Sequence, residues 1–366
     1  MRCTAVRAAV LAISQATGTL PVTIYRADAD GSKKAIADHP VQPLLRDAAN
    51  DWTPAADFRE QMTRDALLHG NAYAKIIRVD GRPYALDRLT PGAGVQVTVD
   101  TLTGEPFYSI NGRSVDCRDI LHIRAPAILH THIAESPVMQ CREAVGVALA
   151  MERHAGDLFG NGARPSGVLK FAGKLGKEVA ERIAGSWSSA FGRGGSARGA
   201  TAVLEEGGDF IPLTFSSVDS QFLELRRFAI EEIARTFRVP SHMLYEMGRA
   251  TWSNVESVGI EFVQYTLAPW ISRWQGEIEL KLFDRDERAS HSVRFDTSEL
   301  LKADTAAFSQ SMTQLIAARV MNPNEARARL NLPAYKGGDK FENPNTLSLS
   351  DRLPSVPGVK DAPNAA

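Results

Sequence analysis

The sequence contains little cysteine. Only Cys3, Cys117 and Cys141 occur in 366 residues, and no two of them form a CxxC pair. An odd number of cysteines without metal-ligand spacing argues against a disulfide framework and a structural zinc site, and indicates a reducing compartment. We therefore expect that neither a disulfide nor a metal holds this fold, and we predict no cofactor.

Long hydrophobic runs and an excess of charge of one sign are missing as well. No window approaches the ~20 apolar residues that a membrane span needs, so no membrane contact is predicted. The formal net charge is -1 at pH 7. This balance excludes the strongly basic footprint of a tight nucleic-acid binder, although it is compatible with local basic patches.

The first third of the chain mixes helical and strand patterns, which predicts an α+β module. Residues 5–17 form a helical pattern, and a second one containing Phe58 and Met62 ends at Gly70, a residue typical of helix stops. Short alternating runs follow, with the tight-turn pairs Asp80-Gly81 and Asn111-Gly112. We predict antiparallel strands joined by hairpins over residues 72–112.

Two long helices are predicted on either side of a small insert. The first runs from Pro137 to Phe159, with Ser136 as its N-cap, and its apolar residues are mostly small. The second covers 219–237 and carries one apolar stripe, which consists of Phe222, Leu225, Ala229, Ile233 and Phe237. The insert, 163–217, has a β-α-β-β pattern that suits a module projecting from the body of the protein.

The stretch "RVPSHMLYEMGRATWSN" follows the second long helix. Pro240 ends that helix, and the capping box Ser253-x-x-Glu256 opens a third helix, in which Pro269 predicts a kink. A strand, a helix over 303–318 and a helix opened by Asn322 and Pro323 complete the pattern. Residues 340–366 are rich in Pro, Asn and Ser and are expected to be disordered.

Three short motifs suggest chemistry, and each lacks what that chemistry needs. His130 and His132 resemble the first metal motif of amidohydrolases, but no repeated βα order surrounds them. The glycine-rich "GRGGSARG", with Arg193 and Arg198, lacks the GK[ST] of a phosphate loop. Ser241 and His242 are adjacent, and adjacent side chains seldom form a nucleophile-base pair. No enzymatic activity is predicted.

Several longer segments, in this order and spacing, resemble tailed-bacteriophage portal proteins of the compact siphophage type, which also occur in prophages and gene transfer agents. The segments are "HGNAYAKIIR", "LHIR", "FGNGARPSGVLK", "LELRRFAIEEIARTFRVPSHML", "TWSNVESVGIEFVQYTLAPW" and "MNPNEARARLNLP". The resemblance spans about residues 5–335. It implies a ring, usually of about twelve copies, around an axial channel for double-stranded DNA at one capsid vertex.

The resemblance also implies a division of the chain. It comprises an N-terminal wing (1–134), two stem helices (135–162 and 218–239) around a clip (163–217), a tunnel loop (240–253), a kinked wing helix and strand (254–299), a C-terminal wing with reduced crown (300–339) and a tail (340–366). The usual glycine before Ser-Pro at the stem start is absent, because "AESP" stands there. Related sequences often start with a longer N-terminal arm, which we expect to be short or missing in this sequence.

Residue roles and partners follow from the same resemblance. The expected DNA-channel residues are His242, Met243, Tyr245, Met247, Arg249 and Trp252, and the expected partner-binding residues of the clip are Arg193 and Arg198. The implied partners are other copies of the chain, DNA without sequence preference, the large terminase, a head-tail adaptor and the major capsid protein. The implied location is the virion, and the bacterial host cytoplasm during assembly.

Two alternatives stay open at this point. One is a metal-dependent hydrolase of amidohydrolase type built around His130 and His132. The other is a different head-tail connector ring protein, such as an adaptor, although adaptors are generally shorter and lack the order of stem, clip and stem.

Overall fold

The fold was analysed in a computed structural model of the chain. The described residues are 3–28, 31–126, 132–160, 167–171, 173, 175–191, 208–212, 217–244, 259–301, 305–330 and 332–341. Helices and antiparallel sheets form two compact units, which are described separately. Residues 1–19 and 48–248 make up the first, and residues 20–47 and 249–366 make up the second. The prediction of a mixed helix and sheet fold is thus confirmed.

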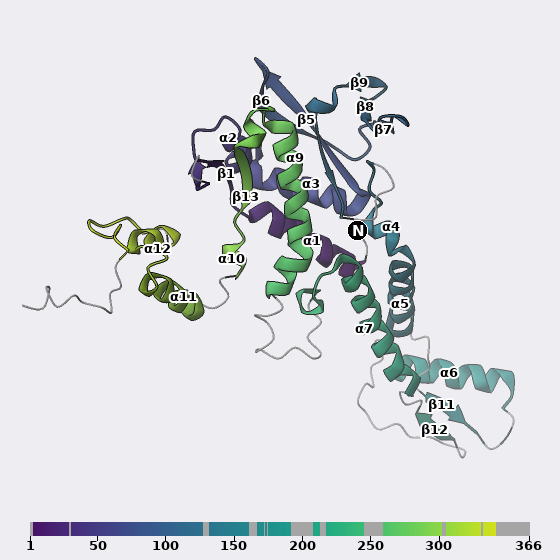
Figure 1. The fold of residues 1–366 in the computed structure, drawn as a ribbon. Helices are drawn as coiled ribbons and strands as arrows, with labels where there is room; N and C mark the ends of the chain where they lie inside the picture. Colours follow the sequence, from purple (N-terminus) through teal and green to yellow (C-terminus); the bar gives the residue numbers. More distant parts are fainter. Residues whose placement is uncertain are drawn as a thin grey trace, which may run out of the picture. The chain divides into compact units, whose positions relative to one another are not determined.

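The core of the first unit consists of two helices and a three-stranded sheet. Its elements are α1 (Thr4–Thr19), α3 (Ala55–His69), β5 (Asn71–Val79), β6 (Arg82–Leu89) and β10 (Ile120–Arg124). The sheet order is β10-β5-β6, and both pairs are antiparallel. Helix α3 packs against α1 and the sheet (Figure 1). The two helices approach closely at Gly18, where a Cβ atom would lie 2.9 Å from the carbonyl oxygen of Ala56.

Tight turns and short strands surround this core. Asp80, Gly81, Asn111 and Gly112 all have positive φ, as the predicted hairpin turns require. A second three-stranded antiparallel sheet, in the order β7-β8-β9, and the short pair β3-β4 complete the strands of this core. Their bounds are β3 (Ala48–Asn50), β4 (Thr53–Pro54), β7 (Val95–Val99), β8 (Pro106–Ile110) and β9 (Arg113–Val115).

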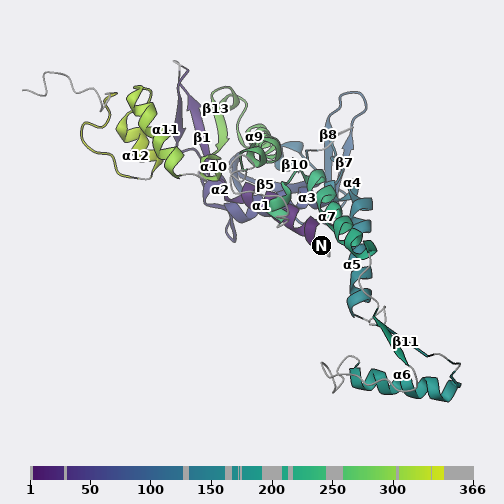
Figure 2. The same cartoon turned by 90° about the horizontal axis from the view of Figure 1, so that it is seen from below.

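The first unit also contains the two predicted long helices. Helix α5 (Arg142–Gly160) lies beside α7 (Ser217–Phe237) in both views (Figures 1 and 2). Between them in sequence come β11 (Gly167–Lys170), α6 (Lys177–Phe191) and β12 (Asp209–Pro212), and β11 pairs antiparallel with β12. The predicted order of helix, small mixed insert and helix is therefore present.

Two details of these helices differ from the prediction. The first predicted helix is interrupted: α4 (Pro137–Gln140) ends where Cys141 leaves the α region, at φ -103° and ψ 21°, and α5 begins at the next residue. Leu225 was assigned to the buried stripe of α7, yet its exposed fraction is 51%. The apolar pattern correctly predicted burial for Ala229, Ile233 and Phe237. It did not show which turns of α7 are packed against another part of the chain, and the turn of Leu225 is not.

The second unit joins segments from opposite ends of the sequence. Strand β1 (Val22–Ala27) lies between β2 (Lys33–Ile36) and β13 (His291–Phe295), and Val22 pairs with Phe295. Helix α9 (Ala268–Leu282) buries Trp270, Trp274 and Ile278, and packs on β13. Residues 20–47 thus share a core with the C-terminal part of the chain rather than with the rest of 1–134.

The helix of residues 259–282 is distorted just before its proline. Phe262–Leu267 form a π-helical segment, and α9 follows it with Pro269 near its start. Proline has no N–H, and its ring clashes with the carbonyl group four residues earlier, here that of Tyr265. A wider turn at this place relieves that clash. The sequence predicted a kink at Pro269, and the structure has a π-helical segment directly before this proline.

Small helices end the described part of the second unit. They are α2 (Gln42–Arg46), α10 (Ser298–Leu301), α11 (Thr305–Ala317) and α12 (Pro323–Arg329). The predicted start of α12 is confirmed, because Asn322 and Glu325 form a capping box. Met312, Met321 and Ala326 make a small core between α11 and α12. Across the described ranges, no helix is both long and apolar enough to cross a membrane.

The side chain of Gln42 ties α2 to β1, and its loss should weaken the second unit. Gln42 Oε1 accepts a hydrogen bond from Ile24 N at 2.9 Å, and its Nε2 donates to Val22 O at 2.9 Å. In Gln42→Leu both buried backbone groups lose this partner, so we expect a loss of roughly 2–5 kcal/mol in the free energy of unfolding. Chemical denaturation measures it.

The matched control is Gln15→Leu on the exposed side of α1, which should change stability little. Equal stability of the Gln42→Leu variant and the wild type would show that β1 does not depend on this side chain.

Candidate functional site

The histidine motif near residue 130 does not form a metal site in the described structure. His132 Nε2 lies 2.8 Å from the carbonyl oxygen of Gly104, which is a hairpin contact, and His130 lies outside the described residues. The part of the chain that the structure describes contains no group of three or more His, Cys, Asp or Glu side chains able to hold a metal ion. The hydrolase alternative therefore has no support.

The segment after α7 is placed only at its beginning. Helix α7 ends at Phe237, and Arg238 adopts a left-handed conformation with φ 56°. Ser241–Leu244 then form a 3-10 turn in which Met243 N donates to Pro240 O at 3.0 Å. His242 and Met243 are half-buried in this turn. The other predicted channel residues, Tyr245, Met247, Arg249 and Trp252, lie outside the described residues.

The predicted partner contacts of the insert also fall outside the described ranges. Arg193 and Arg198 belong to residues 192–200, which the structure does not describe. The described parts of the insert are the β11-β12 pair and α6. Helix α6 ends at Phe191, directly before the residues that the structure does not describe.

The pair of helices α5 and α7 carries its polar residues on its outside. The ring of His154 meets that of Phe222 edge-on at 5.4 Å, which joins the two helices. Ala155 of α5 is buried, as are Ala229 and Ile233 of α7. The exposed charged side chains are of both signs: Arg142, Glu143, Glu152, Arg153, Glu224, Arg226, Arg227, Glu231 and Arg235. A surface of mixed sign does not hold a polyanion tightly.

A cluster of hydrogen bonds fixes the start of the first long helix. Asn71 Nδ2 donates to Ala134 O at 2.8 Å, and Asn71 Oδ1 accepts from Ala134 N at 3.0 Å. Ser136 Oγ donates to Leu68 O at 2.7 Å and accepts from the N–H of Met139, which confirms Ser136 as the N-cap. We call Asn71, Ala134 and Ser136 the stem clasp. It attaches the residues before α4 to the end of α3 and the start of β5.

Gly70 is the residue that makes the stem clasp possible. Its φ is +84°, and a Cβ atom at this position would overlap the backbone of Ala134, Glu135 and Ser136. Its own carbonyl oxygen accepts a hydrogen bond from Ala125 N at 2.8 Å. Glycine is therefore required here both as the stop of α3 and as the surface on which the next segment lies.

Behind the stem clasp lies a buried histidine. His122 Nε2 is 3.0 Å from Asn71 Oδ1, and His122 Nδ1 is 3.0 Å from Tyr108 Oη. Since the bonds to Ala134 fix which end of the Asn71 amide is the oxygen, His122 Nε2 carries the proton and donates. The hydroxyl of Tyr108 then donates to Nδ1. The ring of Tyr73 lies 4.4 Å from that of His122, and burial raises the pKa of Tyr73 to about 12.

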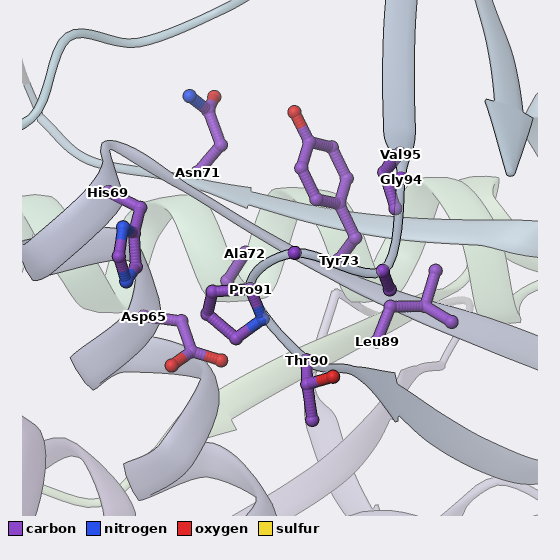
Figure 3. A pocket seen from close by; sticks show the side chains of 12 residues that line it. Asp65, His69, Asn71, Ala72, Tyr73, Leu89, Thr90, Pro91, Gly94 and Val95 are labelled. Atoms are coloured by element: carbon purple, nitrogen blue, oxygen red, sulfur yellow. The ribbon is translucent and has the colours of Figure 1, made fainter. Parts of the chain in front are cut away.

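A hollow of about 380 Å³ lies next to this cluster. Asp65 and His69 of α3, Tyr73 of β5 and the segment 89–95 line it, as Figure 3 shows. Arg88 occupies both carboxylate oxygens of Asp65, at 2.6 and 2.9 Å. The one acidic group of the hollow is thus held in an ion pair and is not available as a general base. The lining residues contain no nucleophile and base in contact.

The sequence patterns did not identify the partners of the stem clasp. Asn71 and His122 are polar residues at strand positions whose neighbours are buried, and β10 is otherwise apolar around His122. A polar residue at such a position is expected to be hydrogen-bonded inside the core. It does not reveal that the partner of Asn71 is Ala134, because the two residues are distant in sequence and meet only in the folded chain.

Removing the Asn71 side chain should destabilise the first unit. In Asn71→Ala the N–H and C=O of Ala134 and the Nε2 proton of His122 all lose the partner described above. We expect a loss of roughly 2–4 kcal/mol in the free energy of unfolding, measured by chemical denaturation.

Asn50→Ala is the matched control. Asn50 Nδ2 donates to Leu86 O at 3.0 Å and to Asp87 Oδ1 at 3.1 Å, and its Oδ1 accepts from the N–H of the exposed Trp52. Asp87 is half-buried and Trp52 is exposed, so water can replace both of these bonds. This change should cost only about 1 kcal/mol. An equal effect of the two variants would contradict a special role for the stem clasp.

Comparison with known proteins gives a consistent result. The family described as "Phage portal protein" matches residues 4–331. The portal protein of Enterobacteria phage HK97 is 28% identical over 335 residues, which cover 89% of this chain and 78% of that protein.

Solved structures agree with this match. A chain in the virion of a native gene transfer agent particle superposes with a TM-score of 0.63 at 25% identity, covering 89% of both chains. A chain in the neck of an empty gene transfer agent particle, computed with C6 symmetry, superposes with a TM-score of 0.60 at 26% identity, covering 89% of this chain and 90% of that one. The chain belongs to the phage portal protein family.

Proposed function

We propose that about twelve copies of this chain form a ring at one capsid vertex and enclose the channel through which double-stranded DNA enters and leaves. The observation that carries the proposal is the helix pair α5 and α7, which flanks a small insert in a chain that matches the portal family from residue 4 to 331. A closed ring requires each copy to present two different faces to its neighbours. Two long helices that lie side by side give each copy two elongated faces for contact with its neighbours in the ring.

Each part of the chain then has a place in the ring. Residues 1–134 form the wing, 135–162 and 218–239 the stem, 163–217 the clip and 240–253 the tunnel loop. Residues 254–299 supply the kinked wing helix and strand, 300–339 a C-terminal wing with reduced crown, and 340–366 the tail. The stem clasp lies at the junction of wing and stem in this assignment.

The channel must let DNA of any sequence slide. Phosphate contacts dominate the affinity of proteins for DNA, so a channel lined with many lysines and arginines would hold the duplex. The net charge of -1 and the mixed signs on α5 and α7 suit weak, sequence-independent contact. Within the tunnel loop we assign the phosphate contact with DNA to Arg249. We assign weak, adaptable contacts with DNA to the other predicted channel residues, which are His242, Met243, Tyr245, Met247 and Trp252.

The energy for DNA movement comes from a partner in this proposal, because we assign the chain no catalysis and no cofactor. Arg193 and Arg198 of the clip contact that partner, which is the large terminase during packaging and a head-tail adaptor afterwards. The wing contacts the major capsid protein. The protein acts in the virion, after assembly in the cytoplasm of the bacterial host.

The first test of this proposal is the oligomeric state. Purified full-length protein should form rings of about a dozen subunits with a central hole wide enough for duplex DNA, in negative-stain images and by mass photometry. Particles that remain monomers across a range of salt and protein concentration would overturn the proposal.

The second test concerns the tunnel loop. Deletion of residues 244–250, and the single change Arg249→Ala, should leave rings intact but reduce the yield of DNA-filled particles several-fold, measured by nuclease-protected DNA per particle. Arg285→Ala, which changes an exposed arginine in the turn after α9, is the control and should package normally. Normal packaging by both loop variants would refute the role of the loop.

A further inference from the structure

Helix α7 carries three large apolar side chains that the rest of the described chain leaves exposed, Leu223, Leu225 and Phe228, and the last two lie on the same side of the helix. Leu225 and Phe228 have exposed fractions of 51% and 49%. Leu225 and Phe228 lie about one turn apart along the helix axis. Viewed down the axis, they are rotated by about a third of a turn from the face that buries Ala229, Ile233 and Phe237. We call Leu225 and Phe228 the apolar knobs. They form a second contact face on a helix whose first face is already packed.

Helix α5 has an outward face with small side chains, in contrast to the large apolar knobs of α7. Gly146 and Ala150 lie one turn apart and are exposed. A Cβ atom at Gly146 would meet nothing within 4 Å, so packing within the chain does not require glycine there. Glycine inside a helix is destabilising relative to alanine, which calls for another reason for its presence. We call Gly146 and Ala150 the small-residue patch.

The apolar knobs and the small-residue patch lie at the same level of the helix pair. The two helices are antiparallel, and His154 contacts Phe222 between them. Since both helices rise equally per residue, Phe228 lies level with Ala148, which stands between Gly146 and Ala150. In the proposed ring the axis runs along the two helices, and a rotation about such an axis preserves this level. A neighbour in a ring would therefore present its Phe228 at the height of the patch.

Charges on the two faces match at the same levels. Arg142 and Arg153 flank the small-residue patch on α5, where Arg142 also pairs with Glu143 at 3.2 Å, and Glu224 and Glu232 flank the apolar knobs on α7. Counted along the antiparallel pair, Arg153 lies within about one residue of the level of Glu224, and Arg142 within about two residues of the level of Glu232. Opposite charges at the rim of an apolar contact favour one register of association.

We propose that the apolar knobs of one copy pack over the small-residue patch of the next copy. This inference rests on the proposed ring and names the contact that closes it. The ring interface joins two different faces of the same molecule, as cyclic symmetry requires, and bulky side chains on one helix fit the flat surface that Gly146 and Ala150 leave on the other. The similar chain in the neck of the empty gene transfer agent particle comes from a structure computed with C6 symmetry, which is a cyclic symmetry.

Substitutions at the faces provide the first test. Leu225→Ala and Phe228→Ala should each raise the protein concentration at which half of the chains are in rings by at least about tenfold, measured by mass photometry. The matched control is Leu223→Ala: Leu223 is 58% exposed on the same helix but points away from the apolar knobs. Its assembly midpoint should equal that of the wild type.

Gly146→Leu separates assembly from folding. A leucine there meets open space within one chain and favours helix, so the thermal unfolding midpoint of the monomer should not fall. The same side chain would collide with the apolar knobs of the next copy, so rings should weaken by at least about tenfold. A variant that forms rings as readily as the wild type would overturn the inference.

Disulfide trapping identifies the two faces directly. A chain with both Ala150→Cys and Phe228→Cys, oxidised with copper phenanthroline, should give a ladder of cross-linked species on a non-reducing gel. The control pair of Ala150→Cys and Leu223→Cys should remain monomeric on the same gel. No ladder from the first pair, or equal ladders from both, would overturn the inference.

The outcomes distinguish this inference from the proposed function. If the wild type forms rings and all the face variants form rings equally well, the ring proposal stands and only the contact assigned here is refuted. A wild type that never forms rings would refute both.

Discussion

The arrangement of the first unit depends on a single backbone junction. Between Gly70 and Ser136 the chain completes its β-hairpins and must return to the end of α3 before α4 begins. The amide of Asn71 takes the place of a strand partner for Ala134, and the hydroxyl of Ser136 bonds to the last turn of α3. Because Gly70 has no side chain, these segments lie in direct backbone contact. The start of the first long helix is thereby held against the core by hydrogen bonds from the side chains of Asn71 and Ser136 to backbone atoms.

Rigid attachment at one end suits a protein that works as part of a symmetric assembly. Angular errors in each subunit accumulate around a ring, so a cyclic arrangement closes only when every copy holds nearly the same shape. The His122 and Tyr108 side chains support the clasp from behind and leave no polar atom of Asn71 facing an apolar surface. Such fully bonded buried groups favour one conformation over its alternatives. The small exposed residues of α5 and the large ones of α7 then gain a defined position.

The sequence predicted the local features and missed those that depend on distant parts of the chain. The stop at Gly70, the hairpin turns and the capping box of Asn322 follow from the preferences of a few adjacent residues, and all are present. The pairing of β1 with β13 was not predicted, because strand partners are selected by the packing of the whole unit. Leu225 shows the same limit: its apolar character was evident, but its intrachain neighbours were not. Of the predicted channel residues, only His242 and Met243 fall within the described structure.

The π-helical segment before Pro269 has a consequence for how this helix tolerates changes in length. A π turn holds one residue more than an α turn, so Phe262–Leu267 act as an inserted residue absorbed within a continuous helix. Deleting one residue there would restore regular α-helical hydrogen bonding and leave the side chains before the segment on the faces that they now occupy relative to Trp270 and Trp274. Homologous chains that lack one residue in this segment should therefore keep the buried tryptophan face and the faces of the side chains that precede it, with an α turn in place of the π turn.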